Sequence, residues 1–427
     1  MPTNGNDNIT FQGTLGQLVV TMTNPYSGRV IEIDDPFNIN NTTYDGLGGT
    51  DTLRMTGGND ALFVTDNTGM QVVQNIEVFR AGRGNDIINL ADTSITLGDV
   101  TLRGNGGNDI LWANEGDDVV YGGGGHDIID GGSGDDRLYG GNGNDDITGS
   151  QGSDLLDGGR GNDILHYNDD SDWLDWTHGH VTWNLGSPGN TFQLNPVFLE
   201  NYNRSTDAFV GGRGTDTIQL TDGNDSIFLQ DTFTVNPLGA NSDARIVDVE
   251  IIRGGAGDDV INMTSNLWTY GDVQLYGEDG DDFLWGNAGD DIIVGGAGWD
   301  HIDGGMGDDI LIVGEGKDKI FSRDSGSDQI VYDTLEAGYV DAIHGFETGV
   351  GNDVLNLTDI LTGYDPATSA IEDFVEFVHV GPHTRVYVDG DGGGDSFVLI
   401  SVMRDVTADV STALAEGNLV VDQSVVI

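Results

Sequence analysis

Cysteine is absent from the 427-residue sequence, and basic residues are scarce. Without cysteine, neither a disulfide nor a thiolate metal site can hold the fold. The 16 Lys and Arg residues stand against 72 Asp and Glu residues, so the net charge is −56. This charge excludes a general nucleic-acid binder and direct adhesion to anionic lipid, because like charges repel. The same repulsion opposes any compact state unless cations neutralise it.

Long hydrophobic runs are missing as well. No apolar stretch reaches the length of a membrane span, so we expect no transmembrane segment. Residues 1–7 lack the basic and apolar regions of a cleaved signal peptide. The 68 glycines would suit a disordered chain, but the apolar content of 37% and the regular placement of Ile, Leu and Val argue against disorder. We therefore expect a fold that metal ions complete.

Glycine and aspartate recur in nine-residue units. Residues 104–166 divide without a gap into seven units, beginning with GNGGNDILW, and residues 277–321 divide into five, beginning with GEDGDDFLW. In every unit, position four is Gly, position six is Asp and position eight is Leu, Ile or Val. The glycine half predicts a tight turn, and the other half predicts a short strand whose central apolar side chain points inward. We expect two units to form one coil, so that turns two units apart stack.

The stacked turns favour a particular metal. They place backbone carbonyls and aspartate oxygens around a gap, and such an all-oxygen environment suits Ca²⁺ rather than zinc or copper. Asn114, Asn287 and Ser150 replace the second glycine of their units. Asn tolerates left-handed backbone geometry next best after glycine, so the sequence predicts that geometry at these positions.

The units resemble G-G-x-G-x-D-x-U-x, the repeats-in-toxin (RTX) nonapeptide, whose family forms calcium-binding parallel β-helices. The resemblance implies an all-β fold, a calcium-stapled parallel β-roll solenoid, with several Ca²⁺ ions as cofactors. Lys317 and Lys319 flank Asp318 and are expected to weaken that site. The implied metal ligands are the position-six aspartates of both series and of isolated units: Asp51, Asp60, Asp86, Asp109, Asp118, Asp127, Asp136, Asp145, Asp154, Asp163, Asp216, Asp225, Asp259, Asp282, Asp291, Asp300, Asp309 and Asp318.

The chain also repeats on a larger scale. Residues 44–65 resemble residues 209–230, and residues 76–90 resemble the segment that starts at Val249. We therefore expect an internal duplication, with short strands at residues 18–22 and 180–185 covering the solenoid. The predicted domains are a first β-roll half, a duplicate half and a small C-terminal β domain, at residues 1–168, 169–333 and 334–427. One continuous solenoid and two separate rolls both remain open.

The C-terminal region differs in texture from the repeats. Its G-F-x-x-G-x-G-x-D-x-L-x-L opening from Gly345, its acidic turn and its closing G-N-L-V-V resemble the target domain of type I secretion substrates. The resemblance implies export by the type I secretion machinery with an uncleaved signal, and a secreted, extracellular or cell-surface location. Asp389, Asp391 and Asp395 would bind one more Ca²⁺ or form a plain acidic hairpin turn.

No catalytic signature such as HExxH or GxSxG occurs, and the cluster of His178 and His180 has no third ligand nearby. We therefore expect no enzyme. The repeats and the tail occupy almost the whole chain, which favours a structural protein that self-assembles as a surface layer, filament or biofilm matrix component. Ca²⁺ would control both its folding and its contacts.

Two other functions are open alternatives. The first is a calcium-dependent adhesin for a cell-surface or matrix glycan, with sugar rings stacking on Trp112, Trp285, Trp173 or Trp176, although packing alone would explain these residues. The second is a carbohydrate-active enzyme or protease accessory module, which is disfavoured because the basic residues are dispersed along the sequence and form no cluster.

Overall fold

Two compact units make up the chain in the computed structural model. The first comprises residues 1–172, 204–219 and 231–249, and the second comprises residues 173–203, 220–230 and 250–427. The three-domain division from sequence stays a prediction. The structure describes residues 8–10, 13–23, 30–40, 44–64, 73–93, 95–166, 181–184, 191–194, 203–204, 207–229, 246–265, 270–322, 326–393 and 396–421.

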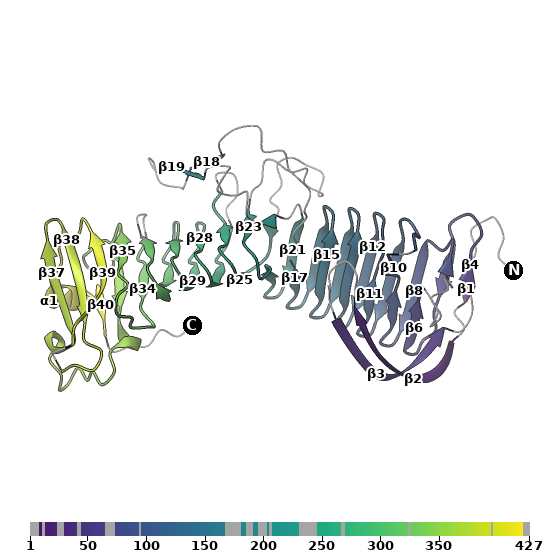
Figure 1. Cartoon of the computed structure of the whole chain (residues 1–427), viewed down its shortest axis with the longest axis horizontal. Coiled ribbons are helices and arrows are strands. Elements are labelled where there is room, and N and C mark those ends of the chain that lie inside the picture. The colour runs from purple at the N-terminus through teal and green to yellow at the C-terminus, as the bar shows by residue number, and fades with distance from the viewer. Residues whose placement is uncertain are drawn as a thin grey trace. The chain divides into compact units, whose positions relative to one another are not determined.

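The first unit, drawn in purple to teal in Figure 1, is a roll of two parallel sheets. One sheet, called sheet A, contains β1 (Asn8–Thr10), β5 (Thr52–Arg54), β8 (Val78–Arg83), β10 (Thr101–Gly106), β12 (Val119–Gly124), β14 (Arg137–Asn142), β16 (Leu155–Arg160), β21 (Ala208–Arg213) and β24 (Ile246–Val247). The other, called sheet B, contains β6 (Asp60–Phe63), β9 (Ile87–Asn89), β11 (Ile110–Trp112), β13 (Ile128–Ser133), β15 (Asp146–Gln151), β17 (Ile164–His166) and β22 (Thr217–Gln219). Strands β4 (Tyr44–Asp45) and β7 (Val73–Gln74) form a separate parallel pair.

One coil of the regular series consists of two nine-residue units, as the sequence predicts. Val120 of β12 pairs in parallel with Leu102 on one side and Leu138 on the other. All three side chains are fully buried, whereas the residues beside them in the strands are partly or fully exposed. Alternation along the strands therefore places every position-eight side chain between the two sheets. The predicted all-β parallel roll is confirmed.

Glycine at position four permits the close stacking of successive turns. Gly125 has φ of 134°. A Cβ at this residue would collide with the carbonyl group of Gly107 in the preceding coil. Any other residue would therefore be strained in backbone conformation and would push the two coils apart.

A long hairpin packs on the outside of sheet B. Strands β2 (Gly13–Thr23) and β3 (Val30–Asn40) pair in antiparallel fashion, and β3 also pairs with β6. Met22 of the hairpin packs with Ala61, Ile87 and Trp112. The strand predicted at residues 18–22 and its covering role are therefore confirmed. The predicted strand at 180–185 corresponds to β18 (Val181–Asn184), which pairs with β19 (Thr191–Leu194).

Two of the proposed sugar-stacking residues are core residues instead. Trp112 is fully buried, and Trp285, its counterpart in the second unit, is 2% exposed. The alternative that packing alone explains them is therefore confirmed, and sugar rings cannot stack on them because their ring faces are covered by the protein itself. Trp173 and Trp176 lie outside the described residues, as do His178 and His180.

The second unit, drawn in green to yellow in Figure 1, repeats the roll. Its sheet C contains β23 (Asp225–Phe228), β26 (Val260–Asn262), β28 (Phe283–Trp285), β30 (His301–Asp303), β33 (Lys319–Phe321) and β35 (Asp341–His344), with β20 (Asn203–Arg204) next to β23. Its sheet D contains β25 (Ile251–Ala256), β27 (Gln274–Asp279), β29 (Ile292–Gly298), β31 (Ile310–Ile312), β32 (Glu315–Gly316), β34 (Gln329–Val331) and β36 (Val354–Asn356).

The C-terminal segment closes the last coil of the second unit. Strand β39 (Val398–Arg404) pairs with β35 and continues into the antiparallel β38 (His383–Val388) and β37 (Val375–Val380). Strand β40 (Leu419–Val420) pairs with β36. The remaining elements are the single-turn helices η2 (Thr358–Ile360) and η3 (Ile371–Asp373) and the helix α1 (Val410–Glu416). None of the described helices is long and apolar enough to span a membrane.

Asn418 ties the two ends of this C-terminal segment together. Its Nδ2 donates to the carbonyl oxygens of Gly349 at 3.0 Å and Asp353 at 2.7 Å, and its Oδ1 accepts from the Gly349 N–H at 2.8 Å. The side chain is 2% exposed. The opening and closing motifs that the sequence singled out are therefore in direct contact, although they lie far apart along the chain.

Candidate metal centres

The position-six aspartates form hydrogen-bonded ladders along the turns. The backbone N–H of Asp109 donates to Oδ1 of Asp127 at 2.8 Å, and the N–H of Asp127 donates to Oδ1 of Asp145 at 2.8 Å. Each of these aspartates is about 1% exposed. One oxygen of every carboxylate is therefore fixed by the preceding coil, which orients the whole side chain.

Four such ladders run through the described residues of the two units. In the first unit, one joins Asp60, Asp86, Asp109, Asp127, Asp145, Asp163 and Asp216, and the other joins Asp118, Asp136, Asp154 and Asp207. In the second unit, one joins Asp225, Asp259, Asp282, Asp300, Asp318 and Asp341, and the other joins Asp291, Asp309, Asp328 and Asp353. Every predicted ligand of the nonapeptide units except Asp51 belongs to one of these ladders. The Asp51 N–H instead donates to Oε2 of Glu77 at 2.6 Å.

The second carboxylate oxygen of many ladder aspartates has no hydrogen-bond partner among the described residues. These Oδ2 atoms are fully buried. A buried acceptor without a partner is costly, so a ligand that contacts it would be stabilising. The buried Oδ2 atoms without a partner are those of Asp86, Asp109, Asp127, Asp136, Asp145, Asp163, Asp259, Asp282, Asp300 and Asp318.

A backbone carbonyl from the next coil lies beside the Oδ2 atoms of Asp109, Asp127, Asp136, Asp145, Asp259, Asp282 and Asp300. The geometry is defined by the first glycine of the unit: a Cβ on Gly140 would lie 2.5 Å from Asp145 Oδ2 and 2.7 Å from the Gly158 carbonyl oxygen. The equivalent point at Gly295 lies 2.6 Å from Asp300 Oδ2. The space over the first glycine is therefore a small cradle lined by a carboxylate and a carbonyl oxygen, the ligand types that Ca²⁺ prefers.

The cradles combine one side chain with backbone oxygens, and they are not clusters of acidic side chains. Among the described residues, no three His, Cys, Asp or Glu side chains converge as a metal-binding group. Ca²⁺ takes six to eight oxygen ligands and accepts backbone carbonyls readily, whereas zinc favours nitrogen and sulfur side-chain ligands. The donor set therefore fits Ca²⁺, while the individual ligand assignments stay predictions.

Burial makes the ladder carboxylates weak acids in the absence of a cation. Desolvation raises the pKa of Asp86 to about 8 and that of Asp300 to about 8, against the ordinary value of 3.8. Asp136 is raised furthest, to a pKa of about 9, by desolvation and by the neighbouring carboxylates of Asp118 and Asp130. A divalent cation next to these groups would remove the reason for the raised pKa values, because it favours the charged form.

Three aspartates at the ends of ladders accept hydrogen bonds from the protein itself through Oδ2. Oδ2 of Asp118 accepts from the Asn114 N–H at 3.1 Å, and Oδ2 of Asp291 accepts from the Asn287 N–H at 2.7 Å. Oδ2 of Asp353 accepts in the same way from the Glu347 N–H at 2.7 Å. Each of these carboxylates therefore hydrogen-bonds to a backbone N–H of its own turn, and its Oδ2 is not left without a partner.

The predicted left-handed geometry of Asn114 and Asn287 is wrong. The prediction is confirmed at Ser150, which has a φ of 76°. Two other non-glycine residues at position two, Asn105 and Glu278, also have positive φ values, of 75° and 72°. The side-chain Nδ2 of Asn114 donates to the Gly98 carbonyl at 3.1 Å, and that of Asn287 donates to the Gly271 carbonyl at 2.9 Å. Each Asn side chain hydrogen-bonds to a preceding coil that lacks the G-G-x-G turn. We therefore attribute the Asn at position two to this side-chain hydrogen bond and not to a left-handed backbone.

The acidic turn of the C-terminal segment contains the three further aspartates predicted to bind Ca²⁺. Asp389 is 1% exposed, and Asp391 is exposed. Both line an open pocket of about 420 Å³ together with Asp333 and Asp359. Asp395 lies outside the described residues. The calcium site predicted here and the plain acidic turn both stay open.

Sequence inspection missed four members of the ladders. Asp207, Asp328, Asp341 and Asp353 are buried like the predicted ligands, but none of them follows a complete G-G-x-G half, although Gly326 and Gly351 keep position four before Asp328 and Asp353. Each stands two residues before a strand residue with a large apolar side chain, in the pattern D-x-U. This shorter pattern would have identified them, because the strand half alone fixes the aspartate in the ladder.

Comparison with known protein families identifies calcium-binding repeats in the same segments as the aspartate ladders. The model for the RTX calcium-binding nonapeptide repeat, in four copies, matches residues 103–138, 139–174, 203–231, 248–262, 276–311 and 285–320. A search of curated proteins found no match. The matched ranges contain the buried aspartates with open oxygens in both units, except Asp86. The chain therefore carries RTX calcium-binding nonapeptide repeats, folded as a parallel β-roll.

Proposed function

We propose that the protein is a secreted structural protein, which folds outside the cell when Ca²⁺ binds and then self-assembles into a surface layer, filament or matrix. The observation that carries the calcium-dependent step is the row of buried, unpartnered Oδ2 atoms beside backbone carbonyls. In a chain of net charge −56, each Ca²⁺ would cancel two negative charges where they are buried. Ca²⁺ that binds only the folded state stabilises it by mass action.

Export before folding is the second part of the proposal. Cytosolic Ca²⁺ is low, so the acidic repeats would stay extended inside the cell and fold only in the calcium-rich exterior. The C-terminal segment would carry the signal for the type I secretion machinery. Its opening and closing motifs are joined through Asn418, which supports its role as one unit.

The structural assignment rests on the repeats and on the sequence. The chain contains no catalytic signature, and its regular turns give both units a periodic surface suited to repeated contacts. We therefore propose that it is not an enzyme. The adhesin alternative loses support because Trp112 and Trp285 are buried.

The calcium-dependent step is tested by the variant Asp127→Asn. The Asn Oδ1 can still accept the Asp109 N–H, so the ladder remains, but an amide replaces the open Oδ2. We expect the Ca²⁺ midpoint for folding, followed by circular dichroism from EDTA to excess Ca²⁺, to rise about tenfold, equivalent to ~1.4 kcal/mol. Asp157→Asn is the control, because Asp157 follows the inward-pointing Leu156 on the outer face of sheet A.

Two results would count against this step: equal midpoints for both variants, or a β spectrum of the wild type that is unchanged by EDTA. The assembly step has its own test. Light scattering and electron microscopy after Ca²⁺ addition should show large regular particles. A persistent monomer would instead favour an adhesin or accessory role.

A further inference from the structure

Arginines that are scattered in the sequence line up on the outer face of sheet A. Arg54, Arg80 and Arg103 are in direct register on the neighbouring strands β5, β8 and β10. Tyr121 and Tyr139 continue the same row on β12 and β14. These five residues are called the arginine ladder. The sequence-based view that the basic residues form no cluster is therefore wrong for this unit.

The ladder is held by stacking. Cζ of Arg103 lies 4.3 Å from the centre of the Tyr121 ring, and the Tyr121 and Tyr139 rings stack at 5.0 Å with an angle of 10° between their planes. Cation–π contacts fix a guanidinium group without neutralising it. Arg103 is thus ordered by its contact with Tyr121 and remains positively charged.

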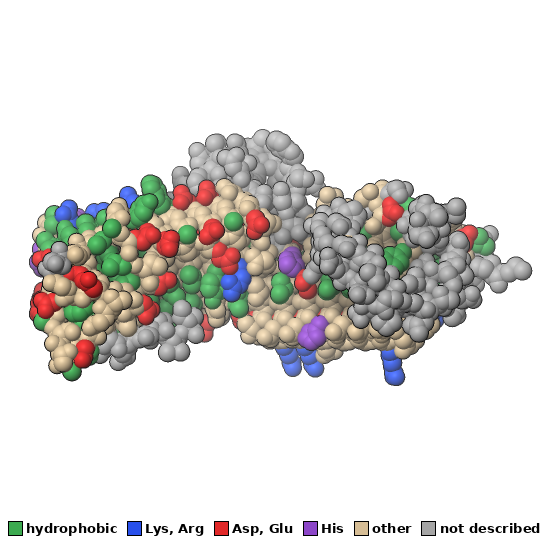
Figure 2. Space-filling view, turned by 60° about the horizontal axis from the view of Figure 1, so that its bottom comes forward, with side chains coloured by type: hydrophobic (Ala, Val, Ile, Leu, Met, Phe, Trp, Pro, Cys, Tyr) green, Lys and Arg blue, Asp and Glu red, His purple; other side chains and the backbone are tan. Residues whose placement is uncertain are grey.

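No acidic side chain within the described residues compensates the charge of Arg80 and Arg103. Neither of them forms an ion pair there, and the buried Nε atoms of both have no hydrogen-bond partner. The remaining arginines of this unit whose side chains are described also lie in strands of sheet A: Arg83, Arg137, Arg160 and Arg213. In Figure 2, basic side chains project together from one side of the first unit. The strands of sheet A thus gather most of the described arginines of this unit, and the row on their outer face is followed, beside Tyr139, by the carboxylate of Asp157.

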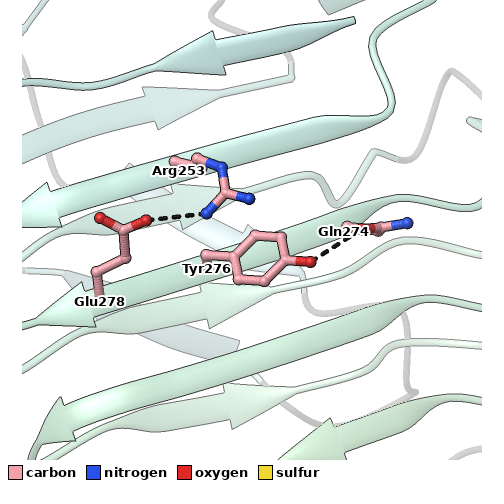
Figure 3. Close-up of polar contacts among 4 residues, drawn as sticks. All are labelled: Arg253, Gln274, Tyr276 and Glu278. Carbon is pink, nitrogen blue, oxygen red and sulfur yellow. Dashed lines mark hydrogen bonds and ion pairs between the residues drawn. The ribbon is translucent and has the colours of Figure 1, made fainter. Parts of the chain in front are cut away.

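In the second unit, a similarly stacked arginine has its charge compensated by a glutamate. Arg253 there stacks on Tyr276 at 4.3 Å, as Arg103 stacks on Tyr121. However, Nη1 of Arg253 lies 3.1 Å from Oε1 of Glu278, which supplies the missing negative charge (Figure 3). By the alignment of the two halves, Arg253 corresponds to Arg80, and the position of Glu278 is occupied in the first unit by the neutral Asn105. Beside Arg103, the residue two positions after Tyr121 is Gly123, which is neutral as well. The unpaired charge is therefore a property of the first unit, not of the fold.

The same molecule carries a row of opposite charge with the same period. Asp99, Asp117 and Asp135, at position five of successive coils, are exposed and linked by N–H to Oδ1 hydrogen bonds of 3.1 and 3.0 Å. Both rows advance by one strand spacing per coil, about 4.8 Å. Carboxylates on one roll can therefore meet guanidinium groups on another in register over several coils, and Arg pairs with carboxylates through two parallel hydrogen bonds.

We propose that the arginine ladder is a docking face for the exposed aspartate row of a second copy of this chain. The inference rests on the proposed self-assembly and names its contact. Copies with net charge −56 repel one another, so association needs a local contact of opposite charge. The contact joins two different surfaces, so it leaves a free ladder on one copy and a free aspartate row on the other. Such a contact extends into filaments or closes into rings.

The double variant Arg80→Gln/Arg103→Gln tests this contact. In saturating Ca²⁺ we expect its monomer to persist to a concentration about tenfold or more above that at which the wild type assembles, measured by sedimentation. Arg253→Gln is the matched control, since it removes a stacked arginine that already has a carboxylate partner, and it should assemble like the wild type. Circular dichroism in Ca²⁺ should be the same for all three proteins.

A chemical cross-link identifies the partner surface. The variant Arg103→Lys places an amine in the ladder, and a carbodiimide joins amines to carboxylates that touch them. Mass spectrometry of mixed heavy- and light-isotope protein should find intermolecular links from position 103 to Asp99, Asp117 or Asp135. High salt during assembly should remove these links, because exposed charges are screened.

The possible failures are distinguishable. A double variant that assembles as readily as the wild type overturns the docking face and leaves the proposed function intact. Wild type that stays monomeric in Ca²⁺ overturns the assembly role itself. Arginine-dependent retention of monomers on an acidic polysaccharide column, with assembly unaffected, would show that the ladder binds a polyanion and not a second copy.

Discussion

Each ladder aspartate has two carboxylate oxygens in different surroundings. In Asp127, for example, Oδ1 accepts a backbone N–H from the preceding coil, while Oδ2 faces the space over Gly122, the first glycine of its own unit. The side chain thus links two coils directly and presents its remaining lone pairs to one defined point. That division explains why aspartate is required at position six, since a glutamate would move the second oxygen away from this point.

Gly140, the first glycine of its unit, is needed for space, not for backbone freedom. For Gly140→Ala, the new Cβ would lie 2.5 and 2.7 Å from two oxygen atoms, closer than real Cβ atoms approach. We expect a loss of about 1–3 kcal/mol in stability and a weaker response to Ca²⁺, because the methyl group occupies the cradle. Chemical denaturation in excess Ca²⁺ measures the first effect, and a Ca²⁺ titration measures the second.

Gly57→Ala is the control for this prediction. A Cβ at Gly57 would have no heavy atom within 4 Å, and the residue has no positive φ. Its replacement should leave both measurements unchanged. If Gly140→Ala behaved like Gly57→Ala, the space over the first glycine would not be where Ca²⁺ acts.

The role of a residue could be predicted from the sequence only where it depends on the nine-residue repeat alone. The buried position-six aspartates and position-eight apolar residues follow from the nonapeptide, because every coil gives them the same surroundings. Asn114 was misjudged because its role depends on the Gly98 carbonyl, which a neighbouring irregular loop supplies. Local sequence carries no information about that loop's path.

At the scale of the strands, register explains both success and failure. Coils of the regular series repeat every two units, so the pairing of β10, β12 and β14 could be read from the sequence. The arginine ladder could not be predicted from the sequence. Arg54, Arg80 and Arg103 are separated by irregular insertions, and only the strand pairing brings them together. Cross-strand neighbours depend on loop lengths, which spacing alone does not reveal.

The C-terminal strands provide a test of the end cap. In Asn418→Ala, the N–H and carbonyl of Gly349 and the carbonyl of Asp353 lose a partner in a largely buried site. We expect a loss of about 1–3 kcal/mol, with faster hydrogen exchange in β36 and β40. Asn352→Ala is the control, because its only described side-chain hydrogen bond, to the Thr348 carbonyl, is solvent-exposed. Equal exchange in both variants would contradict the role of Asn418 in closing the roll.

For the whole molecule, the ladders combine two opposing effects. They bury many carboxylates at fixed points, which is unfavourable while these groups are charged and unneutralised. They also make each of these points a specific place for a cation. A roll with this composition is therefore expected to respond to protons and to Ca²⁺ through the same groups.

This coupling predicts the pH dependence of the calcium-free protein. Burial raises the pKa of Asp127 to about 7 and that of Asp259 to about 8 in the folded state, against 3.8 for the unconstrained group. The folded state therefore binds more protons than the unfolded chain between about pH 4 and 8. Its stability is greatest below the unfolded pKa and is lost as the pH rises through the folded values. In EDTA we expect more β structure by circular dichroism at pH 5 than at pH 8.

With Ca²⁺ present the direction reverses, because protons and Ca²⁺ compete for the same oxygens. The Ca²⁺ midpoint for folding should rise as the pH falls from 8 to 6, and binding should release protons into an unbuffered solution. Asp127→Asn should weaken both the acid-induced folding and the proton release, since one titrating group is removed from the cradle, whereas Asp157→Asn should affect them less. A calcium-free protein that gains no structure on acidification would show that the buried carboxylates do not control folding.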